Sequence, residues 1–264
     1  EIKLFINSKN HFNFIYLLVI KKNFIKMKIA LIGYGKMGKT IEQIAISRGH
    51  EIVAKIDPLT GEDFTSPKFK EADVAIEFTT PDAAYNNYIE AFKQNIPVVA
   101  GTTGWLDKMP EIKDWCENRG QTFFYASNFS IGVNIFFELN SHLAKLMKGQ
   151  DEYDVDITET HHIHKLDAPS GTAISLAEGI IEENSAKSKW ELDKSTSDDS
   201  IKITALREDE VPGIHTVKYE SSVDEIVIHH SAKSRQGFAL GAVLAAEFAA
   251  KNNGFLTMKE LLKF

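Results

Sequence analysis

A glycine-rich segment directly after a short, mostly apolar run constrains the fold of this chain more than any other feature. Residues 28–32 have the character of a buried strand and lead into Gly33-Tyr34-Gly35-Lys36-Met37-Gly38, which has the spacing G-x-G-x-x-G. Residues 40–47 then continue with the periodicity of a helix. In this strand–loop–helix context the glycines allow a tight turn, close approach of a pyrophosphate and close helix–strand packing. The segment predicts a dinucleotide-binding fold, and the alternative is a glycine-rich turn in another α/β fold.

Alternating strand and helix patterns extend this prediction as far as residue 126. Further strands are predicted at residues 51–56, 74–78, 97–100 and 122–126, with a helix at residues 81–94 that starts at a proline. Such alternation is typical of a doubly wound parallel sheet, so we expect a Rossmann-like α/β domain. The polar loops that follow these strands lie at the edge where open α/β sheets bind their ligands.

Asp57 stands at the end of the second predicted strand, about 20 residues after the last glycine of the loop. A carboxylate at this place holds the adenosine ribose hydroxyls in dinucleotide-binding domains. The alternative is a turn residue, because Pro58 follows and the pair is typical of turns. The position at a strand end favours the ribose role.

The pattern changes after Ile131, which suggests a second structural unit. A helix to about residue 148 and a strand at 153–158 precede a polar tract, residues 182–200, in which we expect a long loop. Three antiparallel strands and two helices are then predicted, at residues 201–206, 214–220, 225–231, 236–250 and 257–262. We therefore expect an α+β domain of residues 131–235, inserted into a dinucleotide-binding domain of residues 27–130 and 236–264.

Composition and the first residues limit the class of protein. The net charge of −7 over 264 residues argues against a general nucleic-acid binder. Cys116 is the only cysteine, which excludes an internal disulfide framework and fits a reducing compartment. Residues 1–26 lack a packing period, and we expect them to be an extension outside the native fold. Their apolar run, residues 12–20, is too short to span a bilayer, and the lysines that follow it are in the wrong order for a signal peptide.

Polar side chains are concentrated in residues 159–173, which contain three histidines, a lysine, an aspartate and a Ser-Gly-Thr triplet. A strand is predicted before this segment and a helix after it, so residues 169–172 should begin that helix. Free backbone N–H groups at a helix start bind anions. His161, His162 and Lys165 would add positive charge and protons. The segment suits a carboxylate-bearing substrate that needs protonation.

Two other interpretations of this histidine segment remain. It could be a solvated loop, or it could bind zinc. Zinc sites usually recruit cysteines or two histidines one helical turn apart, and neither pattern is present here. We therefore predict no metal ligands and favour catalysis or anion binding.

Several segments together resemble the 4-hydroxy-tetrahydrodipicolinate reductases, formerly called dihydrodipicolinate reductases. The most specific is the string His-His-x-x-Lys-x-Asp-Ala-Pro-Ser-Gly-Thr-Ala, which starts at His161. The others follow the order of the family across residues 27–264 and are residues 33–38, 78–81, 101–104, 127–134, 211–217 and 234–245.

The resemblance implies a cytoplasmic enzyme of bacterial lysine and diaminopimelate biosynthesis, usually a homotetramer without nucleic-acid or membrane partners. Such an enzyme uses NADH or NADPH to reduce a small cyclic dicarboxylate, 4-hydroxy-tetrahydrodipicolinate, to tetrahydrodipicolinate with loss of water. The inserted domain would bind the substrate and form the tetramer contacts.

The resemblance also implies roles for individual residues. His161 corresponds to the general acid and Lys165 to a second proton donor. The substrate-binding residues are then His162, Gly171 and Thr172, to which the predicted helix start adds Ser170. The cofactor-binding residues, taken from these motifs together with Asp57, are Gly33, Tyr34, Gly35, Lys36, Met37, Gly38, Asp57, Phe78, Thr79, Gly101, Thr102, Thr103, Ala126, Ser127, Asn128 and Phe129.

Small departures from the family pattern affect the cofactor loops alone. Lys36 stands where arginine is usual and Glu77 where aspartate is common. Two other functions remain as alternatives: a dinucleotide sensor without catalysis, and another nicotinamide-dependent amino-acid dehydrogenase. A sensor would not need proton donors such as His161 and Lys165, and the other dehydrogenases would not need the dicarboxylate-binding string.

Overall fold

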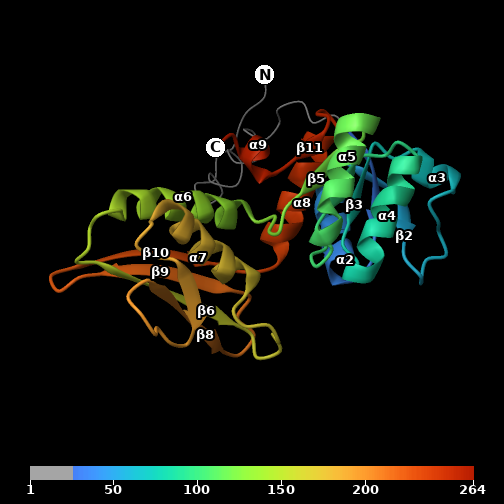
Figure 1. Ribbon diagram of the computed structural model, residues 1–264. Coiled ribbons are helices and arrows are strands. Elements are labelled where there is room, and N and C mark those ends of the chain that lie inside the picture. The colour runs from blue at the N-terminus through green and yellow to red at the C-terminus, as the bar shows by residue number, and fades with distance from the viewer. Residues whose placement is uncertain (1–25) are drawn as a thin grey trace, which may run out of the picture.

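The computed structural model describes residues 26–264 and contains two β-sheets, each with its own helices (Figure 1). The predicted extension, residues 1–26, lies outside the described residues apart from Lys26. Among residues 26–264, no helix combines the length and the apolar character needed to cross a bilayer.

The first sheet has six strands, all parallel, in the order β11-β5-β4-β3-β1-β2. The strands are β1 (Lys28–Ile32), β2 (Glu51–Ile56), β3 (Val74–Glu77), β4 (Val98–Ala100), β5 (Phe123–Tyr125) and β11 (Phe255–Leu256). The order reverses beside β1, because the chain adds β2 on one side and the later strands on the other. A crevice at the carboxyl ends of the strands is expected at such a reversal. The predicted doubly wound parallel sheet is confirmed.

Helices cover both faces of this sheet, which explains why its strands are almost continuously apolar. One face carries α2 (Lys36–Ser47), α8 (Gln236–Ala249) and α9 (Met258–Leu262). The other carries α3 (Pro67–Lys70), α4 (Pro81–Lys93) and α5 (Met109–Arg119), where Cys116 is buried. Because α8 and β11 come from the end of the chain, the last residues complete the sheet that the first ones begin.

The second sheet has five strands in the order β10-β9-β6-β8-β7. They are β6 (Asp154–His161), β7 (Lys189–Leu192), β8 (Ser200–Arg207), β9 (Ile214–Glu220) and β10 (Glu225–Ser231). Two helices, α6 (Ile131–Met147) and α7 (Gly171–Glu183), pack on one face through a shared apolar core (Figure 1). β6 is the central strand, so its carboxyl end, His161, is held by neighbours on both sides.

Two sequence predictions for this sheet are wrong. The expected long loop at residues 182–200 contains the strand β7, which lies at the sheet edge. β8 was expected to be antiparallel, but it runs parallel to both β6 and β7, because α7 returns the chain to the starting end of the sheet before β7 and residues 193–199 return it again before β8. Neither feature has a local signal: β7 is short and lies among polar residues, and strand direction depends on the path of the chain between strands.

Candidate active site

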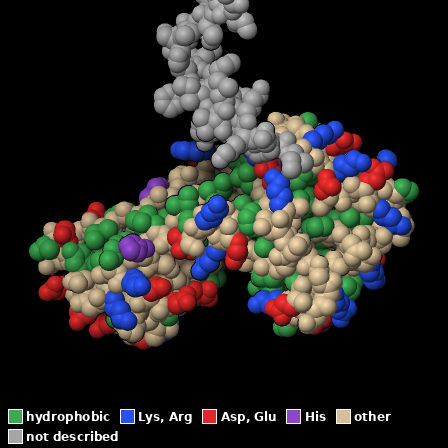
Figure 2. Space-filling model, turned by 90° about the horizontal axis from the view of Figure 1, so that it is seen from above, with side chains coloured by type: hydrophobic (Ala, Val, Ile, Leu, Met, Phe, Trp, Pro, Cys, Tyr) green, Lys and Arg blue, Asp and Glu red, His purple; other side chains and the backbone are tan. Residues whose placement is uncertain are grey.

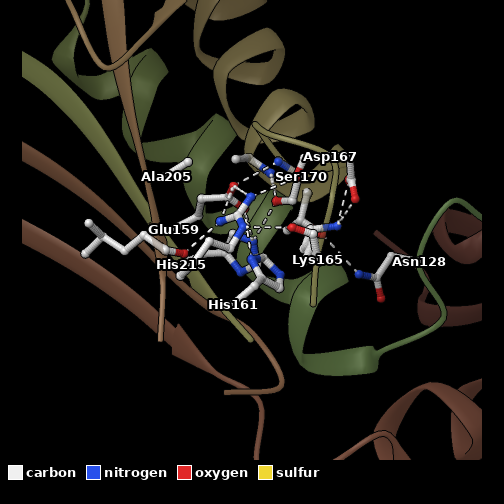
Figure 3. Close-up of polar contacts among 12 residues, drawn as sticks. Asn128, Glu159, His161, Lys165, Asp167, Ser170, Ala205 and His215 are labelled. Atoms are coloured by element: carbon white, nitrogen blue, oxygen red, sulfur yellow. Dashed lines mark hydrogen bonds and ion pairs between the residues drawn. The ribbon is translucent and has the colours of Figure 1, made fainter. Parts of the chain in front are cut away.

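The end of β6 brings two chemically important side chains to one face of the second sheet. Glu159 and His161 are two residues apart, and alternate residues of a strand share a face. Both are buried, and Glu159 Oε2 lies 3.0 Å from His161 Nδ1, as Figure 3 shows. Burial opposes the charge on Glu159, but hydrogen bonding from His161 and Ser170 outweighs it and lowers the carboxyl pKa to about 2.

A second buried histidine comes from the neighbouring strand. His215 on β9 lies opposite Glu159 in the register, and its ring meets that of His161 edge to face at 5.1 Å. Its Nε2 lies 3.2 Å from Ser170 Oγ and 3.8 Å from Glu159 Oε2. Burial is the main cause that lowers the pKa of His215, and electrostatic repulsion from the nearby His161 is the second. The pKa falls to about 3, so this imidazole is neutral near pH 7.

Arg207 at the end of β8 ties the following loop to this cluster. Its guanidinium lies 3.4 Å from Glu159 Oε1 and donates to the backbone oxygens of Asp167, at 2.7 Å, and Lys165, at 3.3 Å. The loop between β6 and α7 is therefore anchored by an arginine that belongs to the sheet. Lys165 is in turn paired with the carboxylate of Asp167, with Nζ–O distances of 2.6 and 2.8 Å.

The start of α7 provides an anion site beside Lys165. Ser170 caps the helix, because its Oγ accepts the N–H of Ala173, and its own N–H donates to Glu159 at 3.0 Å. The first N–H groups of a helix have no partner within it, so those of Gly171 and Thr172 can receive a ligand. A side chain at Gly171 would meet no described atom within 4 Å, so the approach to these groups is open.

The cofactor loops meet this substrate segment at one point. Asn128, between β5 and α6, donates to the hydroxyl of Thr172 at 3.4 Å. This contact joins the carboxyl edge of the first sheet to the helix start of the second. Asn128, predicted to bind the cofactor, and Thr172, predicted to bind the substrate, therefore lie in contact although they are far apart in the sequence.

The glycine loop has the shape that a dinucleotide requires. A Cβ on Gly33 would lie 2.0 Å from the backbone oxygen of Phe78, and one on Gly38 would lie 2.3 Å from that of Gly33. A Cβ on Gly35 would meet nothing within 4 Å and would project into open space. α2 has no side-chain cap at its N-terminus. These features fit a pyrophosphate held against the loop and the start of α2.

A cavity of about 700 Å³ lies along this loop and the neighbouring strand ends. It is lined by Gly33, Gly35, Asp57, Phe78 and Thr79, among others. Asp57 accepts the N–H groups of Leu59, at 3.0 Å, and Tyr34, at 2.8 Å, and these bonds lower its pKa. Its carboxylate therefore stays charged at the end of β2, where the ribose was expected.

Other predicted cofactor residues are less exposed than the sequence suggests. Ala126 and Phe129 are buried in the core, and Tyr34 and Met37 pack partly against it. Gly101 lies against the Phe78 ring, so a Cβ there would be 2.2 Å from the ring. Of the other predicted cofactor residues, Gly35, Lys36, Thr103 and Ser127 are exposed, and Phe78, Thr79 and Asn128 are partly exposed.

Glu77 is a buried carboxylate beneath these loops. It accepts hydroxyl hydrogen bonds from Thr102, at 2.8 Å, from Tyr88, at 3.0 Å, and from Thr79. The Thr102 hydroxyl also accepts the N–H of Thr79 at 2.8 Å, so it both donates and accepts a hydrogen bond within the protein. Burial raises the pKa of Glu77. Its role is to hold the loops after β3 and β4 together.

The three histidines that are adjacent in sequence do not form one cluster. His164 is exposed and pairs with Glu210 at 2.9 Å, and the His162 ring lies 6.0 Å from that of His164. Glu159, His161 and His215 instead bring one potential ligand atom each to within 4.8 Å of one another. They could in principle hold a small cation, but the carboxylate–imidazole contact already accounts for their arrangement.

Known proteins match this chain over most of its length. A family model described as "Dihydrodipicolinate reductase, N-terminus" matches residues 27–129, and one described as "Dihydrodipicolinate reductase, C-terminus" matches residues 132–262. The chain belongs to the dihydrodipicolinate reductase family. The resemblance inferred from the sequence motifs is confirmed.

Individual members of the dihydrodipicolinate reductase family match almost the whole chain. A 4-hydroxy-tetrahydrodipicolinate reductase from Christiangramia forsetii is 54% identical over 89% of this chain and 98% of that protein. One from Archaeoglobus fulgidus is 35% identical over 90% of this chain and 100% of its own length. A solved structure described as dipicolinate-bound dihydrodipicolinate reductase from Paenisporosarcina sp. TG-14 has a TM-score of 0.68 and 24% identity, and covers 88% of this chain and 98% of that one. This last match shows a shared fold.

Sequence reasoning missed several polar residues of this family member's site. Glu159 was within the singled-out segment, and its spacing from His161 on a strand was a usable signal. Arg207 had none, because only the pairing of β8 with β6 brings it there. His215 lay in the segment 211–217 that resembles the family, but it was given no role, and the pairing of β9 with β6 brings it to the site. Glu77 was noted as a departure from the family pattern, without a role.

The neutral His215 predicts that this reductase loses stability in mild acid. Below its ordinary pKa of 6.5 the unfolded chain protonates this histidine, whereas the folded chain does so only near pH 3. Stability is therefore lost as pH falls through this window. Urea unfolding at about pH 7 and about pH 4.5 should show a smaller loss for His215→Gln than for the wild type. Equal losses in the two proteins would contradict this explanation.

Proposed function

We propose that this chain catalyses the NAD(P)H-dependent reduction of 4-hydroxy-tetrahydrodipicolinate to tetrahydrodipicolinate, a step of lysine and diaminopimelate biosynthesis. The observation that carries the proposal is the buried Glu159–His161 pair beside Lys165 and the start of α7, in contact with a cofactor loop through Asn128 and Thr172. Membership of the reductase family supports the same reaction.

Substrate binding uses the start of α7 and Lys165. The backbone N–H groups of Gly171 and Thr172 receive one carboxylate of the dicarboxylate. When the substrate binds, the Lys165 ammonium leaves the Asp167 carboxylate and pairs with a substrate carboxylate instead. It can do so because it is a compact charge on a flexible stem. His162 lies next to His161 and adds a further donor.

The chemical step needs a proton from the protein. The glycine loop and Asp57 hold the dinucleotide, and a bound reduced nicotinamide supplies a hydride. Hydride addition to an unsaturated ring leaves negative charge, which a positioned acid must quench. His161 serves as this acid, and Lys165 as the second donor. Because His161 Nδ1 faces Glu159, the proton leaves from Nε2.

A coupled assay tests the proposal. Dihydrodipicolinate synthase supplies the substrate in place, and oxidation of the reduced nicotinamide is followed by absorbance. Turnover that depends on the synthase supports the reductase. Nicotinamide binding without turnover would favour a sensor, and turnover with a simple amino acid would favour another dehydrogenase.

We also propose that both cofactors are accepted, with NADH at least as good as NADPH. The charged Asp57 favours free ribose hydroxyls and repels a 2′-phosphate, and Pro58 stands where a phosphate-binding arginine could follow. Lys36 is exposed nearby and offsets part of this repulsion. Asp57→Asn should raise kcat/KM for NADPH relative to NADH in steady-state kinetics. A strong preference of the wild type for NADPH would show that Asp57 does not bind the ribose hydroxyls.

We further propose that the enzyme is a cytoplasmic homotetramer whose subunit contacts are formed by the domain of residues 131–235. α6 exposes an apolar stripe of Ile135, Leu139 and Leu146, and Figure 2 shows hydrophobic side chains gathered over this lobe. The sheet face opposite α6 and α7 is also uncovered (Figure 1). Light scattering after gel filtration measures the assembly, and a monomer would overturn it.

A further inference from the structure

The two carboxylate oxygens of Glu159 contact different groups. Oε1 accepts the N–H of Ser170 at 3.0 Å and lies 3.4 Å from the Arg207 guanidinium, so it holds the substrate loop. Oε2 faces the imidazoles instead, 3.0 Å from His161 Nδ1 and 3.8 Å from His215 Nε2. The side chain is completely buried, so no water replaces these partners from bulk solvent.

The opposite edge of the His161 ring is kept open by a glycine. Gly213 precedes β9 with φ of +151°, and a Cβ there would lie 3.1 Å from His161 Nε2. A side chain at this position would therefore crowd the nitrogen that faces away from Glu159. The edge of His215 packs against the ring and limits its rotation further.

We propose that Glu159 is a positioning residue for the proton transfer: the negative charge of its Oε2, 3.0 Å from His161 Nδ1, keeps a proton on Nδ1 and so makes Nε2 the nitrogen that gives up its proton. Before the step, His161 is the doubly protonated imidazolium; its Nε2–H bond breaks, the proton forms a new bond to the substrate, and solvent later restores it. The Nδ1–H stays on His161 and Glu159 stays ionised throughout. The inference rests on the proposed function, in which His161 is the acid.

Other charged groups do not compete for this role. The carboxylate of Asp167 is engaged by Lys165, and that of Glu210 pairs with the exposed His164. His215 is neutral and already contacts Ser170. Within residues 26–264, Glu159 is thus the carboxylate in contact with His161.

The experiment is a double-mutant cycle measured on the full-length enzyme. Glu159→Gln and Glu159→Asp are each made in the wild type and in His161→Ala, and kcat and KM are determined. In the wild type we expect kcat to fall about 10²-fold, within the range for loss of a general acid, with KM changed less than kcat. In the His161→Ala background we expect each change to cost less than about threefold, because the group that Glu159 orients is gone.

Arg207→Gln is the matched control, because the Arg207 guanidinium pairs with Oε1 and the loop, whereas only its backbone lies opposite His161 in the sheet. Its effect should fall on KM and should be the same in both backgrounds. If Glu159→Gln does not fold, Glu159→Asp gives the same comparison; if neither folds, Glu159 is structural and the inference is overturned. Equal losses in both backgrounds would also overturn it. A fully active His161→Ala would instead contradict the proposed function.

Discussion

Replacing His161 or Lys165 by alanine is expected to reduce turnover more than any other single change in this chain. Loss of a general acid typically lowers the rate about 10²–10⁴-fold, so His161→Ala should act mainly on kcat. Lys165→Ala should lower kcat strongly and also raise KM, because the same ammonium binds a substrate carboxylate. NADH affinity should survive both changes, since the glycine loop lies on the other sheet.

Steady-state kinetics and a fluorescence titration with NADH, run on the same preparations, check this prediction. His164→Ala is the matched control: His164 lies in the same loop but is exposed, and its ring pairs with Glu210 at the surface. Its activity should remain close to that of the wild type. If the His161 and Lys165 variants turn over like the wild type, the histidine string is structural. If they lose NADH binding, the defect lies in folding.

Two alanine substitutions in the glycine loop should separate cofactor binding from folding. Gly35→Ala adds a methyl group that meets no protein atom within 4 Å, at a residue with an ordinary φ of −76°, so stability should not change. The methyl group would instead occupy the path of the pyrophosphate. Overpacking typically costs about 1–3 kcal/mol, so the NADH dissociation constant should rise about 10- to 100-fold.

Gly38→Ala should behave differently, because its Cβ would lie 2.3 Å from the backbone oxygen of Gly33. The loop must shift to accept it, so both NADH affinity and the melting temperature should fall. Thermal unfolding beside the NADH titration distinguishes the two variants. Unchanged affinity in Gly35→Ala would place the dinucleotide elsewhere.

The glycine loop, the substrate segment and the doubly wound sheet could all be predicted from the sequence. The glycine loop and the substrate segment were found because each is a local pattern in which a strand, a turn and a helix start follow one another. The doubly wound sheet followed from the alternation of such units. Local patterns therefore located most of the residues on which the proposed chemistry depends.

Residues that support the site from a distance could not be found in this way. Arg207 belongs to a strand whose sequence indicates only alternation, and the family-like segment 211–217 suggested no contact for His215; the place of both beside Glu159 depends on long-range register. The hydroxyl contacts of Glu77 join residues from three elements. The motif also does not indicate which way its side chains face: Ala126 and Phe129 are buried in the core, so only their backbone is available to a cofactor.

The return of the chain to its first sheet has a consequence for biosynthesis. The second sheet is contiguous in sequence, so it can form as soon as β10 has left the ribosome. The first sheet is completed later, because α8 and β11 follow the second sheet in the sequence and the apolar side chains of Ala239, Ala242 and Val243 cover one of its faces. The nascent enzyme therefore carries a half-covered nucleotide domain until α8 and β11 have been made. A polypeptide released early, before residue 236, would present this bare surface to chaperones and proteases.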